Sequence, residues 1–331
     1  MSLPPGPAFP PDPEAPEPPP PPSAPVSPRR RLLLLLAVVV VAALGFGQYT
    51  RNAGRPGNPK GSWTLTPYRG LGAWVDVYDW TTSLSKGDPK VGVRQIEEMA
   101  DAGVQTVFLQ TARANSATAV VEPKLLDQLI DRAHARHLHV VAWYLPTFTD
   151  LDADERHLEA AAALKVDGLA VDIESVAVTE PTQRNQAVID LSSRLRRRID
   201  AKKVLGAITL SPTHLEVVNP AYWPGYPWPE IAKTYDTILP MAYWTIRRGS
   251  LRDGATYVTD TIERIKADTG GLAVPIHVIG GIADQSTTSD LKEMVRVAMS
   301  KGAIGGSLYD WSTSKPDQWK ALAQLRDLRP Q

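Results

Sequence analysis

Residues 166–175 read Val-Asp-Gly-Leu-Ala-Val-Asp-Ile-Glu-Ser and follow an alanine-rich run that is typical of a helix. Successive side chains of a β-strand point to opposite faces, so every second residue shares a face. One face of this stretch is apolar and carries Leu169, Val171 and Ile173. Asp172 and Glu174 emerge together on the other face, and the repulsion between two buried carboxylates raises the proton affinity of one of them. We therefore predict a buried strand that ends in either a hydrogen-bonded structural pair or an acid tuned for proton transfer.

Apolar runs of the same kind recur along the chain from Gly70 onward, and helical patterns lie between them. The runs occupy residues 71–77, 105–110, 138–144, 167–173, 204–210, 236–243, 273–279 and 303–309. Their starts lie 29 to 37 residues apart, which is the length of one strand, one helix and two loops. Eight such units predict an α/β fold, a (β/α)8 TIM barrel over residues 70–328 that a last helix at 317–328 closes.

An open, doubly wound sheet is the alternative fold for such a pattern. It would need a glycine-rich phosphate turn after the first strand. The chain instead has Val77-Tyr78-Asp79-Trp80 at this point, which favours the barrel.

The chain before the barrel consists of three segments of different composition. Residues 1–31 hold 14 of the 30 prolines, and we expect a disordered tail because this composition cannot bury enough apolar surface to fold. Residues 32–47 carry no charge and follow three arginines at 29–31, which predicts a transmembrane anchor with its N-terminal side in the cytoplasm. Residues 48–69 are rich in glycine and proline and are interpreted as a flexible tether.

This arrangement predicts a single-pass protein of the cell membrane whose barrel lies outside the cytoplasm. Two alternatives stay open for residues 32–47. A signal peptide with small residues at Ala43 and Gly45 would be cleaved and leave a secreted barrel. A buried core helix would need neighbours that the flanking segments do not supply. The proline-rich tail offers a binding segment for a cytoplasmic partner, whose identity the sequence does not give.

Charge and residue usage exclude several classes of ligand. The 36 basic and 36 acidic residues cancel, which gives no electrostatic reason to expect nucleic acid as a partner. The chain has no cysteine, so thiolate metal sites and disulfides are excluded. His134, His137, His139 and His157 lack a ligand spacing supported by carboxylates and are interpreted as surface or packing residues. We expect neither a cofactor nor a metal ion.

Carboxylates and aromatic side chains gather where the predicted strands end, which is where (β/α)8 barrels carry their active sites. Aromatic faces suit the C–H faces of sugar rings, and carboxylates suit the hydroxyls and the glycosidic oxygen. The predicted substrate-binding residues are Asp76, Gln110, Trp143, Tyr144, Trp244, Asp310 and Trp311. The aromatic loop at 222–228 is interpreted either as packing over the barrel or as a wall of the substrate site. The sequence thus predicts a carbohydrate site.

Residues 167–174, Asp-Gly-Leu-Ala-Val-Asp-Ile-Glu, resemble the fourth-strand signature of the family 18 glycoside hydrolases, the chitinase-like enzymes. The resemblance implies that Glu174 protonates the leaving oxygen and that Asp172 orients the acetamido group of the substrate. Residues 240–243, Pro-Met-Ala-Tyr, resemble the sixth-strand motif of the family, whose tyrosine, here Tyr243, contacts the same acetamido group. The implied activity is hydrolysis of a β-linked, N-acetylated glycan such as chitin or peptidoglycan.

The resemblance extends to the eighth strand and departs from the family pattern at two positions. Trp311 falls where the family places a tryptophan under the reacting sugar. Ala170 stands where the family has a middle aspartate, and Trp244 stands where an aspartate follows the sixth-strand tyrosine. Both losses affect the network of acids. The alternative function is therefore a non-catalytic module that binds cell-wall glycan on the same barrel.

A second resemblance is to the lysozyme-like barrels of glycoside hydrolase family 25. It rests on an aspartate after the first strand, Asp76 or Asp79, together with the Asp-Ile-Glu at 172–174. A third interpretation makes the barrel a scaffold whose proline-rich tail recruits a cytoplasmic protein.

Overall fold

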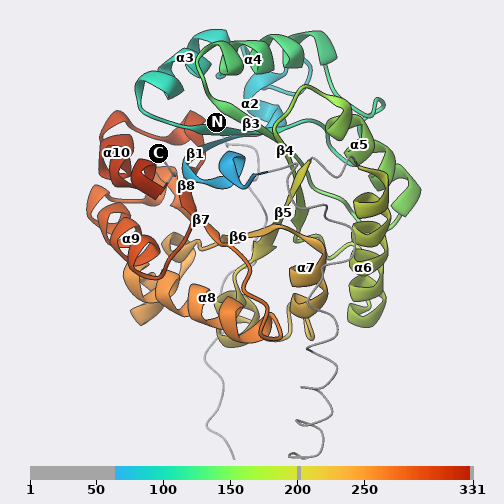
Figure 1. Ribbon diagram of the computed structural model, residues 1–331, viewed down its shortest axis with the longest axis vertical. Coiled ribbons are helices and arrows are strands. Elements are labelled where there is room, and N and C mark those ends of the chain that lie inside the picture. Colours follow the sequence, from blue (N-terminus) through green and yellow to red (C-terminus); the bar gives the residue numbers. More distant parts are fainter. Residues whose placement is uncertain (1–63, 200–202, 329–331) are drawn as a thin grey trace, which may run out of the picture. The chain divides into compact units, whose positions relative to one another are not determined.

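The computed structural model describes residues 64–199 and 203–328 (Figure 1). The predicted proline-rich tail, the membrane anchor and most of the tether lie outside these residues, so they stay predictions. Within the two described ranges, every helix is too short or too polar to span a bilayer.

Eight parallel strands form a closed barrel in the order of the sequence. The strands are β1 (Gly70–Val75), β2 (Thr106–Gln110), β3 (His139–Tyr144), β4 (Gly168–Ile173), β5 (Val204–Leu210), β6 (Thr237–Met241), β7 (His277–Ile282) and β8 (Gly305–Tyr309). Parallel pairing of β1 with β8 closes the ring and places Leu71 beside Gly306. The prediction of a (β/α)8 barrel is confirmed, and the open sheet is excluded.

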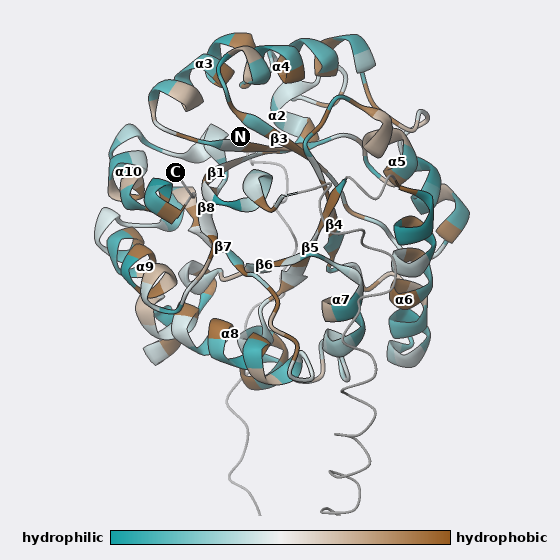
Figure 2. Cartoon of the chain, in the orientation of Figure 1, coloured by the Kyte–Doolittle hydropathy of each residue, from teal (hydrophilic) through white to brown (hydrophobic). Residues whose placement is uncertain are grey.

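Helices surround the strands as an outer ring (Figure 1). They are α3 (Val93–Asp101), α4 (Pro123–Ala135), α5 (Leu151–Ala163), α6 (Pro181–Arg198), α7 (Trp228–Thr234), α8 (Gly254–Asp268), α9 (Thr288–Ser300) and α10 (Pro316–Ala321), and a short α2 (Val77–Trp80) follows β1 directly. Each long helix turns an apolar stripe toward the strands. In α9 the buried residues are Leu291, Met294, Val295, Val297 and Ala298. Figure 2 shows the resulting pattern, in which the outer sides of the helices are largely hydrophilic.

Two predicted boundaries differ from the structure by several residues. The seventh strand begins at His277 instead of residue 273, because Pro275 has no N–H to donate to a neighbouring strand. The carbonyl of Pro275 accepts a hydrogen bond from Ile238 N at 3.0 Å. The predicted last helix divides after Ala321 into α10 and a 3-10 helix, η7 (Ala323–Leu328). Neither difference changes the order of strands and helices.

The barrel interior is filled by aromatic and polar side chains. Trp74 on β1 stacks on Phe108 on β2 with ring centroids 4.3 Å apart. The indole N–H of Trp74 donates to Ser307 Oγ at 2.8 Å, and Ser307 Oγ lies 3.0 Å from His277 Nε2. These buried polar groups satisfy one another's hydrogen bonds, and they join β1, β7 and β8 where the barrel closes.

Tyr68 fills the end of the barrel at which the strands begin, which we name the base. It belongs to the 3-10 turn η1 (Thr66–Tyr68) before β1 and is fully buried. Its hydroxyl donates a hydrogen bond to the carbonyl oxygen of Leu169 at 2.6 Å. Gly206 leaves the space for its ring, since a Cβ at Gly206 would lie 2.7 Å from a ring carbon of Tyr68. The ring of Tyr68 therefore occupies the interior of the barrel at its base.

Candidate functional site

The fourth strand carries Asp172 and Glu174 to the end of the barrel at which the strands finish, which we name the mouth. A Cβ at Gly168 would lie 3.1 Å from the Tyr68 ring, so this position faces the barrel interior. Alternation along the strand turns Ala170 and Asp172 inward as well. Asp172 is 6% exposed, and Glu174 is partly exposed at the mouth. The predicted pair of carboxylates at the end of a buried strand is thus present.

Both carboxyl groups bind protons more tightly than usual. Burial, and after it the charge of Glu174, raises the pKa of Asp172 well above its ordinary value. Burial raises the pKa of Glu174 to about 7. Asp172 Oδ1 is buried and has no hydrogen-bond partner in the described part of the chain. A pair of this kind holds a transferable proton near neutral pH.

Tyr243 follows β6 and lies between the carboxylate pair and the end of β8. Its side chain is 2% exposed. Burial, and then the charges of Glu174, Asp172 and Asp310, raise the pKa of Tyr243 far above its ordinary value. Its ring centroid lies 6.1 Å from that of Tyr309. A neutral tyrosine at this place can donate a hydrogen bond to a ligand bound at the mouth.

The aromatic loop at 222–228 packs on the end of β4. The hydroxyl of Tyr226 donates to the carbonyl oxygen of Ile173 at 2.8 Å. Trp223 and Trp228 lie against Tyr226, with ring centroids 5.0 Å and 4.7 Å away. All three rings are buried, which supports the packing interpretation for this part of the loop.

Tyr222, the first residue of this loop, is only partly buried. Its ring contacts that of His214 edge-on, with centroids 5.3 Å apart. Burial and then the charge of Glu174 raise the pKa of Tyr222, because a phenolate beside a carboxylate is unfavourable. Tyr222 therefore lies near Glu174, as the buried Tyr226 of the same loop also does.

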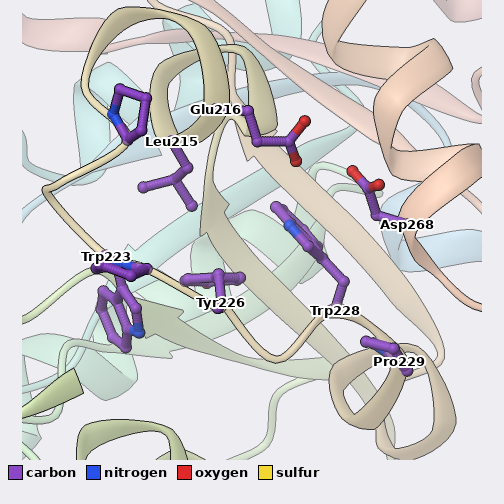
Figure 3. Close-up of a pocket in the computed structure, with 10 residues that line it drawn as sticks. Leu215, Glu216, Trp223, Tyr226, Trp228, Pro229 and Asp268 are labelled. Carbon is purple, nitrogen blue, oxygen red and sulfur yellow. The ribbon is translucent and has the colours of Figure 1, made fainter. Parts of the chain in front are cut away.

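A cavity of about 510 Å³ lies beside the same loop (Figure 3). Its lining includes Leu215, Glu216, Trp223, Tyr226, Trp228 and Asp268. Figure 3 shows Glu216 and Asp268 turned toward each other, and burial together with Glu216 raises the pKa of Asp268 to about 6. Neither Asp172 nor Glu174 lines this cavity, so it is separate from the carboxylate pair.

Three further carboxylates gather where β1 and β8 end. Asp76 accepts a hydrogen bond from Tyr78 N at 2.7 Å and begins α2. Asp310 accepts one from Thr313 N at 2.9 Å and begins the turn after β8. Asp79 is 4% exposed; burial, and then the charges of Asp76 and Asp310, raise its pKa to about 7. One oxygen from each carboxylate lies within 4.8 Å of the other two.

Gln110 and Trp143 stand at the ends of β2 and β3. Gln110 Oε1 accepts a hydrogen bond from Val77 N at 3.0 Å, which fixes the start of α2 at the mouth. Trp143 is 5% exposed and packs edge-on against Trp74, with ring centroids 5.8 Å apart. Its indole nitrogen has no hydrogen-bond partner among the described residues. Trp143 thus lies over the aromatic interior of the barrel.

Tyr144 faces the other way. Its hydroxyl donates a hydrogen bond to Asp154 Oδ1 in α5 at 2.8 Å. Its ring stacks on that of His157, with ring centroids 4.9 Å apart. Adjacent residues of a strand point to opposite faces, so Trp143 and Tyr144 cannot both face the interior. The structure therefore does not bring Tyr144 to the mouth, unlike the expectation from the sequence.

Trp244 and Trp311 pack against the helical ring. Trp244 is fully buried, and a Cβ at Gly254, the first residue of α8, would lie 3.1 Å from its ring. Trp311 is partly exposed and contacts Trp319 of α10, with ring centroids 4.9 Å apart. Tyr309, two residues before Trp311, is the aromatic side chain of the eighth strand that faces Tyr243.

Asp167, the first acidic residue of the strand-four signature, lies near the base and not at the mouth. Burial opposes its ionisation, but hydrogen bonds from His139, Val140 N and His134 outweigh it and lower the pKa of Asp167 to about 2. This carboxylate joins α4 and β3 to β4. The packing interpretation of His134 and His139 is confirmed.

Tyr309 was not among the residues that the sequence predicted for the site, whereas Asp79 entered only through the family 25 resemblance and Tyr222 only as part of the aromatic loop. Side chains two residues apart on a strand share a face. Since Ser307 points into the barrel, Tyr309 does so as well. No local signal places Asp79 beside Asp310, because these two residues come from opposite ends of the barrel sequence.

Comparison with known proteins supports the fold. The sequence matches no protein-family model and no curated protein. The spore cortex-lytic enzyme SleL of Bacillus cereus is similar in structure, with a TM-score of 0.57 at 8% identity over 78% of this chain and 74% of SleL. A chitinase from Chromobacterium violaceum is similar as well, with a TM-score of 0.54 at 12% identity over 78% of this chain and 98% of the chitinase.

A family 18 N-acetylglucosaminidase from Paenibacillus barengoltzii gives a TM-score of 0.53 at 9% identity, over 78% of this chain and 99% of the enzyme. At such identities a structural match shows the fold and not the activity. The resemblance to family 18 barrels is thus confirmed at the level of the fold, in a divergent sequence.

Proposed function

We propose that the barrel is a glycoside hydrolase that acts on a β-linked, N-acetylated glycan of the chitin or peptidoglycan type. The observation that carries the proposal is the pair Asp172 and Glu174, which leaves a buried strand on its inward face with raised pKa values. Tyr243 and Trp143 lie on the same inward side of the mouth. A polar floor between aromatic walls suits a sugar ring.

The proposed reaction uses Glu174 as the proton donor. Its carboxyl proton passes to the glycosidic oxygen as the bond from that oxygen to the anomeric carbon breaks. The acetamido oxygen of the substrate forms a bond to the anomeric carbon, which closes a second ring on the sugar. A water molecule then attacks the anomeric carbon, the bond from this carbon to the acetamido oxygen breaks, and the water gives a proton to Glu174. Asp172 and Tyr243 hold the acetamido group by hydrogen bonds, which are the roles that the family resemblance implies.

Ala170 favours a second candidate, a module that binds glycan without cleaving it. The family has an aspartate at this inward position, and Asp172 Oδ1 has no hydrogen-bond partner among the described residues. Without that neighbour the acetamido group would be held less firmly, which lowers the rate of the internal attack. Asp76, Gln110, Asp310 and Trp311 are proposed as substrate contacts in both candidates.

We further propose that residues 32–47 anchor the protein in the cell membrane, with the proline-rich tail in the cytoplasm and the barrel outside. The uncharged run after three arginines supports this. A cell-wall glycan would then be the polymer within reach, and the cytoplasmic partner of the tail is not identified.

Turnover of defined glycans tests the function. The purified protein is incubated with chitin oligomers and peptidoglycan fragments, and new reducing ends are measured. Cleavage by the wild type and its loss in Glu174→Gln support a hydrolase, with the exposed Asp284→Asn as the control. Binding without cleavage supports the binding module. The absence of both contradicts the proposal and leaves the pair a structural feature.

A further inference from the structure

The first and last strands of the barrel meet at a group of three carboxylates. Asp76 and Asp79 belong to the segment that begins α2 directly after β1. Asp310 follows the last residue of β8. Since β1 and β8 pair side by side, closure of the barrel brings together residues from the two ends of its sequence.

Hydrogen bonds hold two of these side chains in place. Asp76 Oδ1 accepts from Tyr78 N at 2.7 Å. Asp310 Oδ1 accepts from Ser312 Oγ at 3.0 Å and from Thr313 N at 2.9 Å. One oxygen from each of Asp76, Asp79 and Asp310 lies within 4.8 Å of the other two. A cation with oxygen ligands at about 2.3–2.6 Å can reach oxygens on opposite sides of it that are up to about 5 Å apart.

Asp79 supplies an independent observation. The side chain is 4% exposed, yet its Oδ2 atom has no hydrogen-bond partner in the described residues. The hydroxyl of Ser312 lies nearby but has one proton, which it donates to Asp310 Oδ1. A buried carboxylate oxygen without a partner loses its hydration and gains nothing in return. Such an oxygen indicates a ligand.

The positive charge beside the group is smaller than the negative charge. Lys90 Nζ lies 3.8 Å from Asp79 Oδ1, and the lysine side chain is 52% exposed. One solvated ammonium balances one of three carboxylates at most. A divalent cation among the three would remove the remaining repulsion.

We propose that Asp76, Asp79 and Asp310 bind a hard divalent cation, with calcium as the preferred ion, and that this cation joins the first strand of the barrel to the last. The three donors are oxygens only, which suit calcium, magnesium or manganese and not the softer transition metals. Calcium accepts irregular sets of six to eight oxygens. Asp76 is partly exposed, so water molecules can complete the coordination on that side.

The site differs from the expectation of no metal, and it gives Asp76 and Asp310 a role other than the direct substrate contact proposed above. It does not depend on the roles proposed for Glu174 and Asp172. It does adjoin the mouth, because the hydroxyl of Tyr309 donates to Asp76 Oδ2 at 3.3 Å. The ring of Tyr309 in turn faces Tyr243. A cation at the carboxylates would therefore also fix the position of Tyr309.

Calorimetric titration of the metal-free full-length protein with calcium chloride tests the proposal, with magnesium and manganese chlorides in parallel. We expect one site per chain. We also expect the melting temperature to rise by about 5 °C or more when calcium is a hundredfold above its Kd. Asp79→Asn and Asp310→Asn each keep the side-chain volume and remove one charged ligand, so both should weaken calcium binding about tenfold or more. Asp284→Asn removes an exposed carboxylate elsewhere and should bind as the wild type does.

Terbium luminescence gives a second measurement that does not depend on the melting temperature. Terbium binds calcium sites, and Tyr309, whose hydroxyl lies 3.3 Å from Asp76 Oδ2, is close enough to sensitise its emission. Asp79→Asn should remove this signal and Asp284→Asn should keep it. The proposal is overturned if none of the three cations binds the wild type or raises its melting temperature. It is equally overturned if binding is unchanged in both Asp79→Asn and Asp310→Asn.

Discussion

The Nδ1–H of His277 donates a hydrogen bond to the backbone carbonyl oxygen of Tyr68, 2.8 Å away inside the barrel. A carbonyl oxygen only accepts, so the proton of the neutral ring is on Nδ1, and Nε2 accepts from the Ser307 hydroxyl at 3.0 Å. The ring is fully buried, and burial lowers the pKa of His277 to about 4. This imidazole ties the closed base of the barrel to its seventh and eighth strands.

We expect the contribution of His277 to the free energy of unfolding to decrease as the pH falls from about 6.5 to about 4. In this window the unfolded His277 binds a proton that the folded ring does not, so protonation favours the unfolded chain. Protonation of His277 in the unfolded chain should lower the free energy of unfolding by roughly 3 kcal/mol across this pH window. Urea unfolding of the wild type and of His277→Gln, which does not titrate, at several pH values measures the effect, because the wild type should lose stability relative to the variant as the pH falls. Equal pH dependence in the two proteins would contradict the assignment.

Gly206→Ala should destabilise the barrel by roughly 1–3 kcal/mol. The added Cβ would lie 2.7 Å from the ring of Tyr68 and 2.8 Å from Leu239, and both neighbours are fully buried. Gly92→Ala is the matched control, because the nearest atom to its Cβ would be Gln95 Oε1 at 3.7 Å. Thermal unfolding compares the two. Similar melting temperatures for both variants would show that Tyr68 does not fill the base tightly.

Glu174→Gln should lower the turnover of a cleaved glycan by roughly 10²–10⁴-fold with little change in its binding. Glutamine keeps the size and the hydrogen bonding of the side chain but has no proton to transfer. Since the pKa of Glu174 is raised to about 7, wild-type activity should decline as the pH rises above about 7, where the donor loses its proton. Initial rates across the pH range, with calorimetry for binding, check both statements. An unchanged rate in Glu174→Gln would contradict the assignment of Glu174 as the proton donor.

Asp172→Asn should reduce kcat more than it changes KM, because the hydrogen bond proposed for Asp172 orients the acetamido group for attack and is strongest in the transition state. Steady-state kinetics on one defined oligomer measures the two constants. A pure increase in KM would mean that Asp172 contributes only to binding.

Trp311→Ala tests the binding-module candidate. If the wild type binds glycan without cleaving it, binding should be lost in Trp311→Ala and kept in Glu174→Gln. Because Trp311 also contacts Trp319, the melting temperature of the variant is measured beside its affinity. A loss of affinity that follows a loss of folding would not support a role in binding.

Protease added to intact cells should digest the barrel or the segment before it and leave the proline-rich tail protected. The prediction follows from the three arginines that precede residues 32–47. Antibodies against the two ends of the chain detect the fragments, and lysed cells provide the control. Protection of the barrel until lysis would place it in the cytoplasm and refute the proposed topology.

The sequence predicts the barrel well because each of its strands has a strong local pattern. Leu169, Val171 and Ile173 have the apolar period of a buried strand, and this period alone turns Asp172 and Glu174 to one side. The start of β7 is less predictable, since Pro275 interrupts the pairing within an otherwise apolar run.

The rim of the mouth is predicted less well because side-chain directions change where a strand stops. Trp143 faces inward and Tyr144 outward, although both lie in the same aromatic strand end. Trp311 follows the end of β8 and contacts a helix instead of continuing the alternation from Tyr309. The group that includes Asp79 needs the closed ring itself, because pairing of β1 with β8 is a contact between distant parts of the chain.

The turn Thr66–Tyr68 enters the barrel at its base, while Glu174 lies at the opposite end of the strands. Strands of six residues are roughly 20 Å long, so this length of barrel separates the turn Thr66–Tyr68 from the mouth. The first described residues therefore lie at the opposite end of the barrel from the mouth, where the proposed substrate would bind. A protein fused before Thr64, or attachment of the chain to a surface at this point, should leave the mouth accessible to large, immobile polymers.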